Sequence, residues 1–245
     1  VYGYGLMIGI GILAAYFSAE HRAKARGLDS EKVFGFVLSC VIAGFIGSKI
    51  LYTITVFDEV IANPRSLIEN FSSGWVVYGG IIGGIVGGAL YCRVNKLPVF
   101  RFIDNAFPSV AIGQGFGRLG CFLAGCCYGI ECDGPLCVTF KNSRFAPNNV
   151  PLVPTQLISS AADFILAAIL ILMYKKFNKP GQTLSAYLVL YSVGRFVIEF
   201  FRGDGRGSVG ALSTSQFIAL FTFAAGVIGF VIATKHTTSS GDELT

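Results

Sequence analysis

Apolar residues recur along the chain in stretches of about 20, separated by short polar segments. About 20 consecutive apolar residues is the length that an α-helix needs to cross the hydrocarbon core of a bilayer. The pattern therefore predicts an all-α integral membrane protein of about seven transmembrane helices. The expected spans are residues 2–20, 33–57, 75–93, 101–124, 155–174, 184–201 and 213–234.

The composition supports this prediction. Hydrophobic residues make up 53% of the 245 residues, and charged residues only 13%, whereas a soluble domain carries about 25% charged residues. We therefore expect one transmembrane domain over residues 1–236. The polar residues 237–245 are expected to form a disordered tail.

The net charge of +5 arises from short basic clusters between the apolar stretches, not from a long basic tract. This distribution is typical of membrane topology signals and does not favour a nucleic-acid partner. Short basic loops face the cytoplasm, so the N-terminus is expected outside and the C-terminus in the cytoplasm. The basic segments are residues 21–32, 93–101 and 175–179, together with the tail after Lys235.

Several charged residues fall inside the expected spans, and three of them indicate a site. Arg118 lies toward the outer end of the fourth span, and Arg195 and Glu199 lie deep in the sixth. A charge at the centre of a span costs about 2.5–3.5 kcal/mol, so these side chains are expected to face a cavity or a partner. Two guanidiniums from different helices make a clamp for a phosphate, because each presents a planar fork of donors. In a bilayer, that phosphate belongs to a phospholipid headgroup.

Two interpretations of the charges in the sixth span stay open. Arg195 and Glu199 are four residues apart on one helical face, so they form either a structural ion pair or part of a site. Arg202 lies one turn beyond Glu199 and is a candidate for the same buried set. Asp163, near the middle of the fifth span, is a further intramembrane carboxylate.

The glycines of the third and fourth spans also have two interpretations. Small residues let helix backbones approach closely in lipid, but the same positions leave room for a lipid against the backbone. The candidates for such a substrate-binding role are Gly79, Gly80, Gly117 and Gly120.

Five cysteines crowd into one short segment at the expected outer face. They are Cys121, Cys126, Cys127, Cys132 and Cys137. On an oxidising face this proximity permits one or two disulfides that would hold the loop over the site. The alternative is a nucleophilic thiolate whose pKa is lowered by Arg118. We expect no metal, because His21 and His236 both fall on the opposite side.

Nine residues at the end of the fourth span, from Gly117 to Gly125, have the sequence GRLGCFLAG. Four other motifs occur elsewhere in the chain. In chain order, those motifs are Tyr4-Gly5-Leu6-Met7, Gly79-Gly80-Ile81-Ile82-Gly83-Gly84, Pro154-Thr155-Gln156-Leu157 and the segment from Gly194 to Arg202. Together they resemble the bacterial prolipoprotein diacylglyceryl transferase family, whose signature commonly reads G-R-x-G-N-F-x-N-G-E. The resemblance covers nearly the whole chain.

The resemblance implies a bacterial plasma-membrane enzyme whose active site faces outside. It implies transfer of the diacylglyceryl group from phosphatidylglycerol, or another anionic phospholipid, to the lipobox cysteine of a prolipoprotein. Glycerol phosphate is released, a thioether forms, and no cofactor is expected. By motif, Arg118 and Arg195 match the family's essential arginines. The positions that line the family's site correspond to Tyr4, Tyr191, Glu199 and Arg202. Glu199 is expected to be catalytic, and Cys121 of the signature is expected to bind substrate with the others.

The chain departs from the family pattern at several positions. Tyr78 stands where the family has a histidine, Cys121 and Ala124 replace the two signature asparagines, and Cys126 replaces the glutamate. The Tyr78 hydroxyl is a candidate for proton transfer, although a pKa near 10 makes tyrosine a poor base.

These departures leave the acceptor open. The alternatives are a transferase that moves a phospholipid-derived group, glycerol phosphate included, to a glycan or small molecule, and a lipid-binding or transport protein that reuses the fold.

Overall fold

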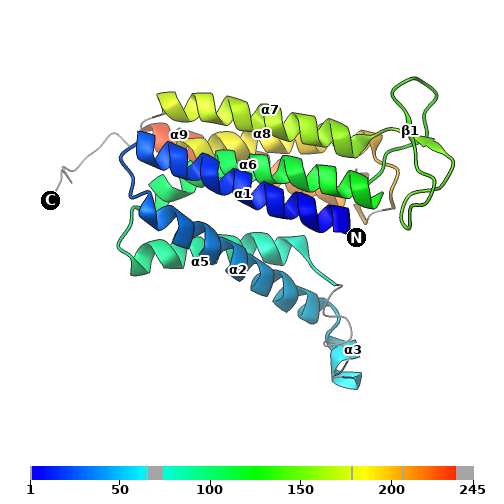
Figure 1. Cartoon of the computed structure of the whole chain (residues 1–245), viewed down its shortest axis with the longest axis horizontal. Coiled ribbons are helices and arrows are strands. Elements are labelled where there is room, and N and C mark those ends of the chain that lie inside the picture. The colour runs from blue at the N-terminus through cyan, green and yellow to red at the C-terminus, as the bar shows by residue number, and fades with distance from the viewer. Residues whose placement is uncertain (1, 64, 66–73, 178, 206, 236–245) are drawn as a thin grey trace. The chain divides into compact units, whose positions relative to one another are not determined.

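The computed structural model describes residues 2–63, 65, 74–177, 179–205 and 207–235. Seven long helices form within this part of the chain, which confirms the predicted all-helical fold (Figure 1). They are α1 (Tyr2–Ala25), α2 (Glu31–Thr55), α5 (Val77–Val94), α6 (Val99–Ala124), α7 (Thr155–Lys176), α8 (Gln182–Ile198) and α9 (Thr214–Lys235). Among the described residues, six of these helices are long and apolar enough to cross a membrane, and α6 is the exception. The expected tail, residues 237–245, lies outside the described residues.

Most helix ends lie within three residues of the predicted spans, and the end of the first span differs most. Charged residues were expected to end the first span near residue 20, but α1 continues to Ala25. A Glu20–Lys24 ion pair, 2.7 Å long and one turn apart, supports this extension. The sixth span ends as a 3₁₀ turn, η1 (Glu199–Phe201), which tightens the chain before it leaves the helix. A short helix, α3 (Phe57–Ala62), follows α2.

The contacts between residues divide the described chain into two compact units. Unit 1 comprises the described residues of Val1–Ala19 and Ile103–Thr245, and unit 2 those of Glu20–Phe102. The boundaries fall inside α1 and α6. The expectation of a single transmembrane domain stays a prediction.

Unit 2 is built on the close packing of α2 against α5. A Cβ atom on Gly47 would overlap the carbonyl oxygen of Gly79, and a Cβ atom on Gly83 would overlap that of Ala43. Only glycine lets two helix backbones come this close, and such contacts hold helices together in lipid. The glycine-rich sequence of α5 is therefore explained at Gly79 and Gly83 by packing.

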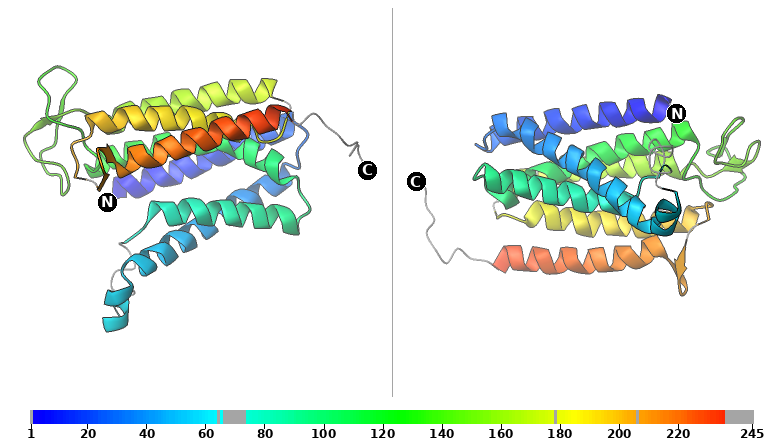
Figure 2. Two further views of the ribbon diagram at one scale, coloured as in Figure 1. Left: turned by 180° about the vertical axis from the view of Figure 1, so that it is seen from behind. Right: turned by 90° about the horizontal axis from the view of Figure 1, so that it is seen from below.

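The core of unit 1 lies between α6, α7 and α8. Its buried residues are Ala111, Leu166, Ala167, Leu170, Ala186 and Tyr187. Helix α8 also packs along α9, as the two views of Figure 2 show. Within α6 and α7, buried polar side chains find partners on neighbouring helices: Ser160 Oγ donates to the Gly115 carbonyl at 2.9 Å. Helix α6 itself buries the polar residues Asp104, Asn105 and Ser109, which reduce its apolar character.

The start of α8 is held by a carboxylate from α6. Asp104 accepts hydrogen bonds from the backbone N–H groups of Gly181, at 2.6 Å, and Leu184, at 2.9 Å. The first N–H groups of a helix have no partner within the helix, and a carboxylate there also interacts favourably with the helix dipole. Asp104 is 5% exposed, so water does not replace it readily.

Asp104→Ala is expected to lower the free energy of unfolding by about 1–3 kcal/mol, because two buried N–H groups lose their acceptor. Asp104→Asn, which keeps one acceptor oxygen, should lose less. Thermal unfolding in detergent, followed by circular dichroism, measures both, with the exposed Asp133→Ala as control. An Asp104→Ala protein as stable as the control would contradict this role.

Two loops extend from one end of unit 1 (Figure 1). The first joins α6 to α7 and contains the strands β1 (Val138–Thr139) and β2 (Pro151–Leu152), which pair antiparallel. The second joins α8 to α9 and contains the antiparallel strands β3 (Ser208–Val209) and β4 (Leu212–Ser213). An isolated bridge between Gly129 and Arg202 connects the two loops.

Candidate active site

Three charged residues from three helices of unit 1 interact within the span. Asp163 of α7 is buried, and its carboxylate interacts electrostatically with both Arg118 of α6 and Arg195 of α8. The arginines that the sequence predicted to act jointly thus both lie in the electrostatic reach of one carboxylate. The sequence identified Asp163 as an unusual intramembrane charge, but its interaction with both arginines depends on how α6, α7 and α8 pack.

Arg195 is fixed on two further sides. Its Nη2 atom lies 2.7 Å from Glu199 Oε2 and donates a hydrogen bond of 2.8 Å to Ser215 Oγ of α9. The Arg195 and Glu199 side chains are 13% and 5% exposed, so the ion pair is shielded from water. The structural ion pair that the sequence left open is present, and Ser215 is a partner that no sequence motif signalled. A catalytic role for Glu199 stays a prediction.

Two tyrosines of α8 connect Arg118 to the core. Tyr191 interacts electrostatically with Arg118, and its ring stacks on that of Tyr187 with centroids 5.3 Å apart and planes 8° apart. The Tyr187 hydroxyl donates a hydrogen bond of 2.9 Å to Gln114 Oε1. The orientation of Tyr191 is therefore supported by buried residues of α6 and α8.

The remaining motif residues of α1 and α6 pack against each other. A Cβ atom on Gly120 would lie 3.0 Å from Tyr4 Cδ2, and one on Gly117 would lie 3.8 Å from Ile8 Cδ1. Gly120 thus leaves space for the half-exposed Tyr4 ring, which also interacts electrostatically with Arg118. Packing accounts for Gly120, and the substrate-binding roles of Gly117, Gly120 and Tyr4 stay predictions.

The C-terminal end of α6 brings three thiols together. The Cys126 N–H donates to the Cys121 carbonyl, and the Gly125 N–H donates to the Phe122 carbonyl, both at 3.1 Å. With Gly125 at φ +73°, these bonds form a Schellman motif, which reverses the chain over the last helical turn. Cys127 follows at φ +62°. As a result, the sulfur atoms of Cys121, Cys126 and Cys127 all lie within 4.8 Å of one another.

The start of α7 anchors the backbone of this turn. Thr155 Oγ1 donates to the Cys127 carbonyl and Gln156 Nε2 donates to the Cys126 carbonyl, each at 2.8 Å. Both α7 side chains are 1% exposed. The Thr-Gln pair of the PTQL motif therefore fixes the positions of two cysteines, a connection that the spacing along the chain did not reveal.

Arg202, at the start of the second loop, lies beside the cysteines because the two loops are hydrogen-bonded to each other. Backbone hydrogen bonds run from Ile130 N–H to the Phe201 carbonyl and from Gly203 N–H to the Tyr128 carbonyl. They place the Arg202 guanidinium against the Cys127 thiol. Arg202 also donates two hydrogen bonds to Asp204, of 2.7 and 2.6 Å. Arg202 is thus a neighbour of the cysteine cluster, and its ion pair with Asp204 holds it there.

The two cysteines farther along the loop, Cys132 and Cys137, form a disulfide. Cys126 and Cys127 carry thiols, and the pKa values of these two thiols shift in opposite directions. Hydrogen bonds from the thiols of Cys121 and Cys126, and then the Arg202 guanidinium, lower the pKa of Cys127. Hydrogen bonding with the thiols of Cys121 and Cys127 raises the pKa of Cys126.

In reduced protein near pH 7, iodoacetamide is expected to alkylate Cys127 before Cys126, because a lower pKa leaves more of the reactive thiolate. Arg202→Gln should slow the Cys127 reaction by about tenfold, since one nearby cation shifts a pKa by about one unit or more. Peptide mass spectrometry over time measures both rates, with the exposed Arg144→Gln as control. Equal alkylation rates at Cys126 and Cys127 would contradict the opposite pKa shifts of the two thiols.

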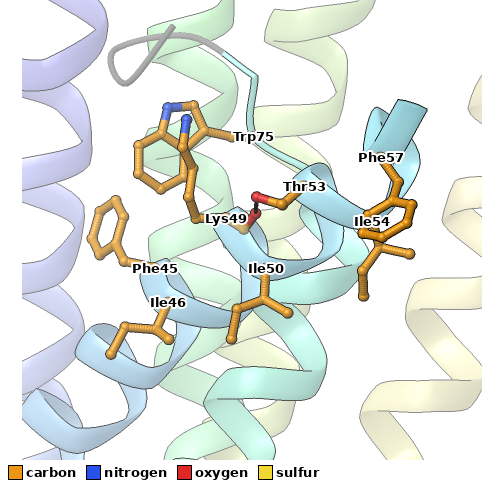
Figure 3. A pocket seen from close by; sticks show the side chains of 8 residues that line it. All are labelled: Phe45, Ile46, Lys49, Ile50, Thr53, Ile54, Phe57 and Trp75. Carbon is orange, nitrogen blue, oxygen red and sulfur yellow. Dashed lines mark hydrogen bonds between the residues drawn. The ribbon is translucent and has the colours of Figure 1, made fainter. Parts of the chain in front are cut away.

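Unit 2 carries the other predicted site residues, together with an apolar pocket. Tyr78 is exposed near the start of α5, and Gly79 and Gly80 follow it; the site roles of all three stay predictions. The pocket, of about 530 Å³, lies along α2 (Figure 3). Its lining residues are Phe45, Ile46, Lys49, Ile50, Thr53, Ile54, Phe57 and Trp75.

Lys49 is the one charged residue of the lining. Its Nζ atom lies 5.1 Å from the ring centroids of both Tyr52 and Trp75, and Phe45 stands edge-on to Trp75 at 5.6 Å. Aromatic faces attract a cation, so Lys49 is held between the two rings. An apolar lining with one cation suits a lipid chain below an anionic headgroup.

Comparisons with known proteins identify the family. The family model for prolipoprotein diacylglyceryl transferase matches residues 1–232. A phosphatidylglycerol–prolipoprotein diacylglyceryl transferase of Clostridium tetani is 47% identical over 95% of this chain and 93% of that relative. A second, of Clostridium perfringens, is 45% identical over 93% of this chain and 89% of that relative. With its long apolar helices and this full-length similarity, the chain is a multi-pass membrane protein of the prolipoprotein diacylglyceryl transferase family.

Proposed function

We propose that this chain transfers the diacylglyceryl group of phosphatidylglycerol to the thiol of a prolipoprotein cysteine, with Arg118 and Arg195 binding the lipid phosphate. The observation that carries the assignment of the site is the interaction of both arginines with Asp163. Two guanidiniums in the electrostatic reach of one buried carboxylate lie near enough to each other to serve one anion, and a phosphate is the anion that the donor lipid supplies.

The reaction displaces a phosphate ester from carbon. Negative charge grows on the departing phosphate as the carbon–oxygen bond breaks, and fixed donors in a dry site stabilise it. Both arginines provide such donors: the Arg195 side chain is only 13% exposed, and Arg118 is half-buried. The leaving group is glycerol phosphate.

The neighbouring side chains position the clamp. Glu199 and Ser215 fix Arg195 from two sides, and Asp163 balances the arginine charges until lipid arrives. A bound phosphate then replaces the carboxylate as the partner of the guanidiniums. Asp163 is accordingly a positioning residue in this proposal.

The active site is proposed to face the outside of the bacterial plasma membrane. The basic loops that the positive-inside rule assigns to the cytoplasm lie at the opposite ends of the helices from the cysteine-bearing loop. That loop contains the Cys132–Cys137 disulfide, and disulfides persist in oxidising compartments. Both observations support this orientation.

Incubation of the purified protein with phosphatidylglycerol and a lipobox peptide tests the proposal. Mass spectrometry should find a peptide heavier by one diacylglyceryl group and an equal amount of glycerol phosphate. Peptide carrying serine in place of the lipobox cysteine is the control and should remain unmodified. Glycerol phosphate released without peptide modification would indicate a different acceptor, and the absence of both products would indicate lipid binding without transfer.

A further inference from the structure

The three thiols at the end of α6 have the geometry of a metal site. Their sulfur atoms lie within 4.8 Å of one another. Zinc binds thiolates at about 2.3 Å, which puts the sulfurs of a three-thiolate site about 4 Å apart. Side-chain rotations that move each sulfur atom by less than about 1 Å therefore bring Cys121, Cys126 and Cys127 to bonding distance of one zinc ion. The expectation of no metal rested on the position of the histidines, but three thiolates need no histidine.

The backbone around these thiols is fixed in advance. The Schellman motif at Gly125 places Cys126 over Cys121, and the buried Thr155 and Gln156 side chains hold the carbonyls of Cys127 and Cys126. Ligands held by hydrogen bonds from a neighbouring helix are a mark of metal sites that keep their geometry.

The surrounding charges fit a zinc ion with three thiolates, which together carry a net charge of −1. Arg202 contacts Cys127, and Arg118 interacts electrostatically with Cys121 and Cys127. Tyr4 also interacts electrostatically with all three thiols. Soft thiolate ligands select zinc and other thiophilic ions over magnesium or calcium.

We propose that Cys121, Cys126 and Cys127 bind one Zn²⁺ whose fourth position takes the thiol of the acceptor cysteine. Catalytic zinc sites have three protein ligands and one open position, and zinc deprotonates a thiol that binds to it. This role rests on the proposed function. The acceptor thiol releases its proton to water on binding zinc. Its sulfur then attacks the carbon of the diacylglyceryl group that is bonded to the phosphate oxygen, and a sulfur–carbon bond forms. The carbon–oxygen bond breaks, and its electron pair leaves with glycerol phosphate.

Zinc content tests the site without any activity measurement. Reduced protein in detergent, loaded with Zn²⁺ and freed of excess by gel filtration, should retain about one zinc per chain, with three sulfur ligands at about 2.3 Å by X-ray absorption. Cys121→Ser, Cys126→Ser and Cys127→Ser should each lower zinc affinity by at least about tenfold. Cys40→Ser, outside the cluster, is the matched control and should bind as the unmodified chain does.

The site would be overturned by protein that holds no zinc although its cluster cysteines are reduced, or by zinc that is lost equally in Cys40→Ser. A disulfide between cluster cysteines that persists under reductant would also overturn it. Variants are compared only after a thermal unfolding curve matches that of Cys40→Ser, and Cys126→Ala provides a second substitution if the serine variant unfolds.

The rate of transfer tests the role of the fourth position. A free cysteine has a pKa of about 8.5, so only about 3% of the acceptor is thiolate at pH 7 without zinc. Zinc removal should therefore slow transfer about 30-fold at pH 7 and less than about twofold at pH 9, where the free thiol ionises unaided. Equal transfer rates with and without zinc at pH 7 would overturn the role of zinc in activating the acceptor thiol. They would not contradict the zinc site itself. Failure of the proposed function is distinguishable, because then neither form makes product at either pH.

Discussion

Arg118→Ala and Arg195→Ala are each expected to lower the rate of diacylglyceryl transfer by about 100- to 1,000-fold. Loss of one fixed donor to a developing oxyanion costs about 2.7–4 kcal/mol in other enzymes, and each arginine supplies charge as well as donors. Arg118→Lys and Arg195→Lys should recover little, because lysine keeps the charge but lacks the planar fork. Release of glycerol phosphate, measured at saturating lipid, gives the rates.

The control for the arginine variants is Arg144→Ala, an exposed arginine of the same unit. It should transfer at the unmodified rate. An Arg118→Ala protein that folds and keeps more than about a tenth of the activity would contradict the assignment of the clamp, since that loss is below the cost of one donor.

Gly79→Ala is expected to destabilise unit 2, whereas Gly80→Ala is not, although the two residues are neighbours on α5. A Cβ atom on Gly79 would overlap the carbonyl oxygen of Gly47, so that α2 and α5 must separate. A Cβ atom on Gly80 would lie 3.5 Å from the Gly44 carbonyl oxygen, an ordinary contact. Overpacking of this kind costs about 1–3 kcal/mol, and alanine in place of a helical glycine contributes up to about 1 kcal/mol.

Thermal unfolding of the two glycine variants in detergent measures this difference. Gly79→Ala should unfold at a lower temperature than the unmodified chain, and Gly80→Ala at the same or a higher one. Equal destabilisation would mean that close packing does not explain Gly79. Loss of activity in a fully stable Gly80→Ala protein would support the substrate-binding role predicted for that residue.

The helical architecture followed from the sequence because lipid leaves few alternatives. An apolar run of about 20 residues must satisfy its own backbone hydrogen bonds and therefore forms a helix. The fourth span was predictable despite its polar residues, since Arg118 and its neighbours interrupt an otherwise apolar stretch. The end of the first span was misplaced because Glu20 and Lys24 support a further helical turn as well as they mark a membrane boundary.

The internal arrangement of the site depended on tertiary packing that the sequence does not display. Asp163 is 45 residues from Arg118 and 32 from Arg195, and its electrostatic interaction with both exists only once three helices pack. The meeting of Cys121 with Cys126 depends on a positive φ at Gly125. A cysteine spacing of five residues is equally compatible with a continuing helix, which would point the two thiols to different faces.

The central claim is that the α6 and α8 arginines bind the phosphate of the donor lipid. The most direct test compares binding of phosphatidylglycerol with binding of diacylglycerol, which has the same acyl chains and no phosphate, by native mass spectrometry. The unmodified chain should prefer phosphatidylglycerol by at least about tenfold, because charge-assisted hydrogen bonds contribute about 1.5–3 kcal/mol each. Arg118→Ala should lose most of this preference. The same preference in Arg118→Ala and the unmodified chain would contradict the account.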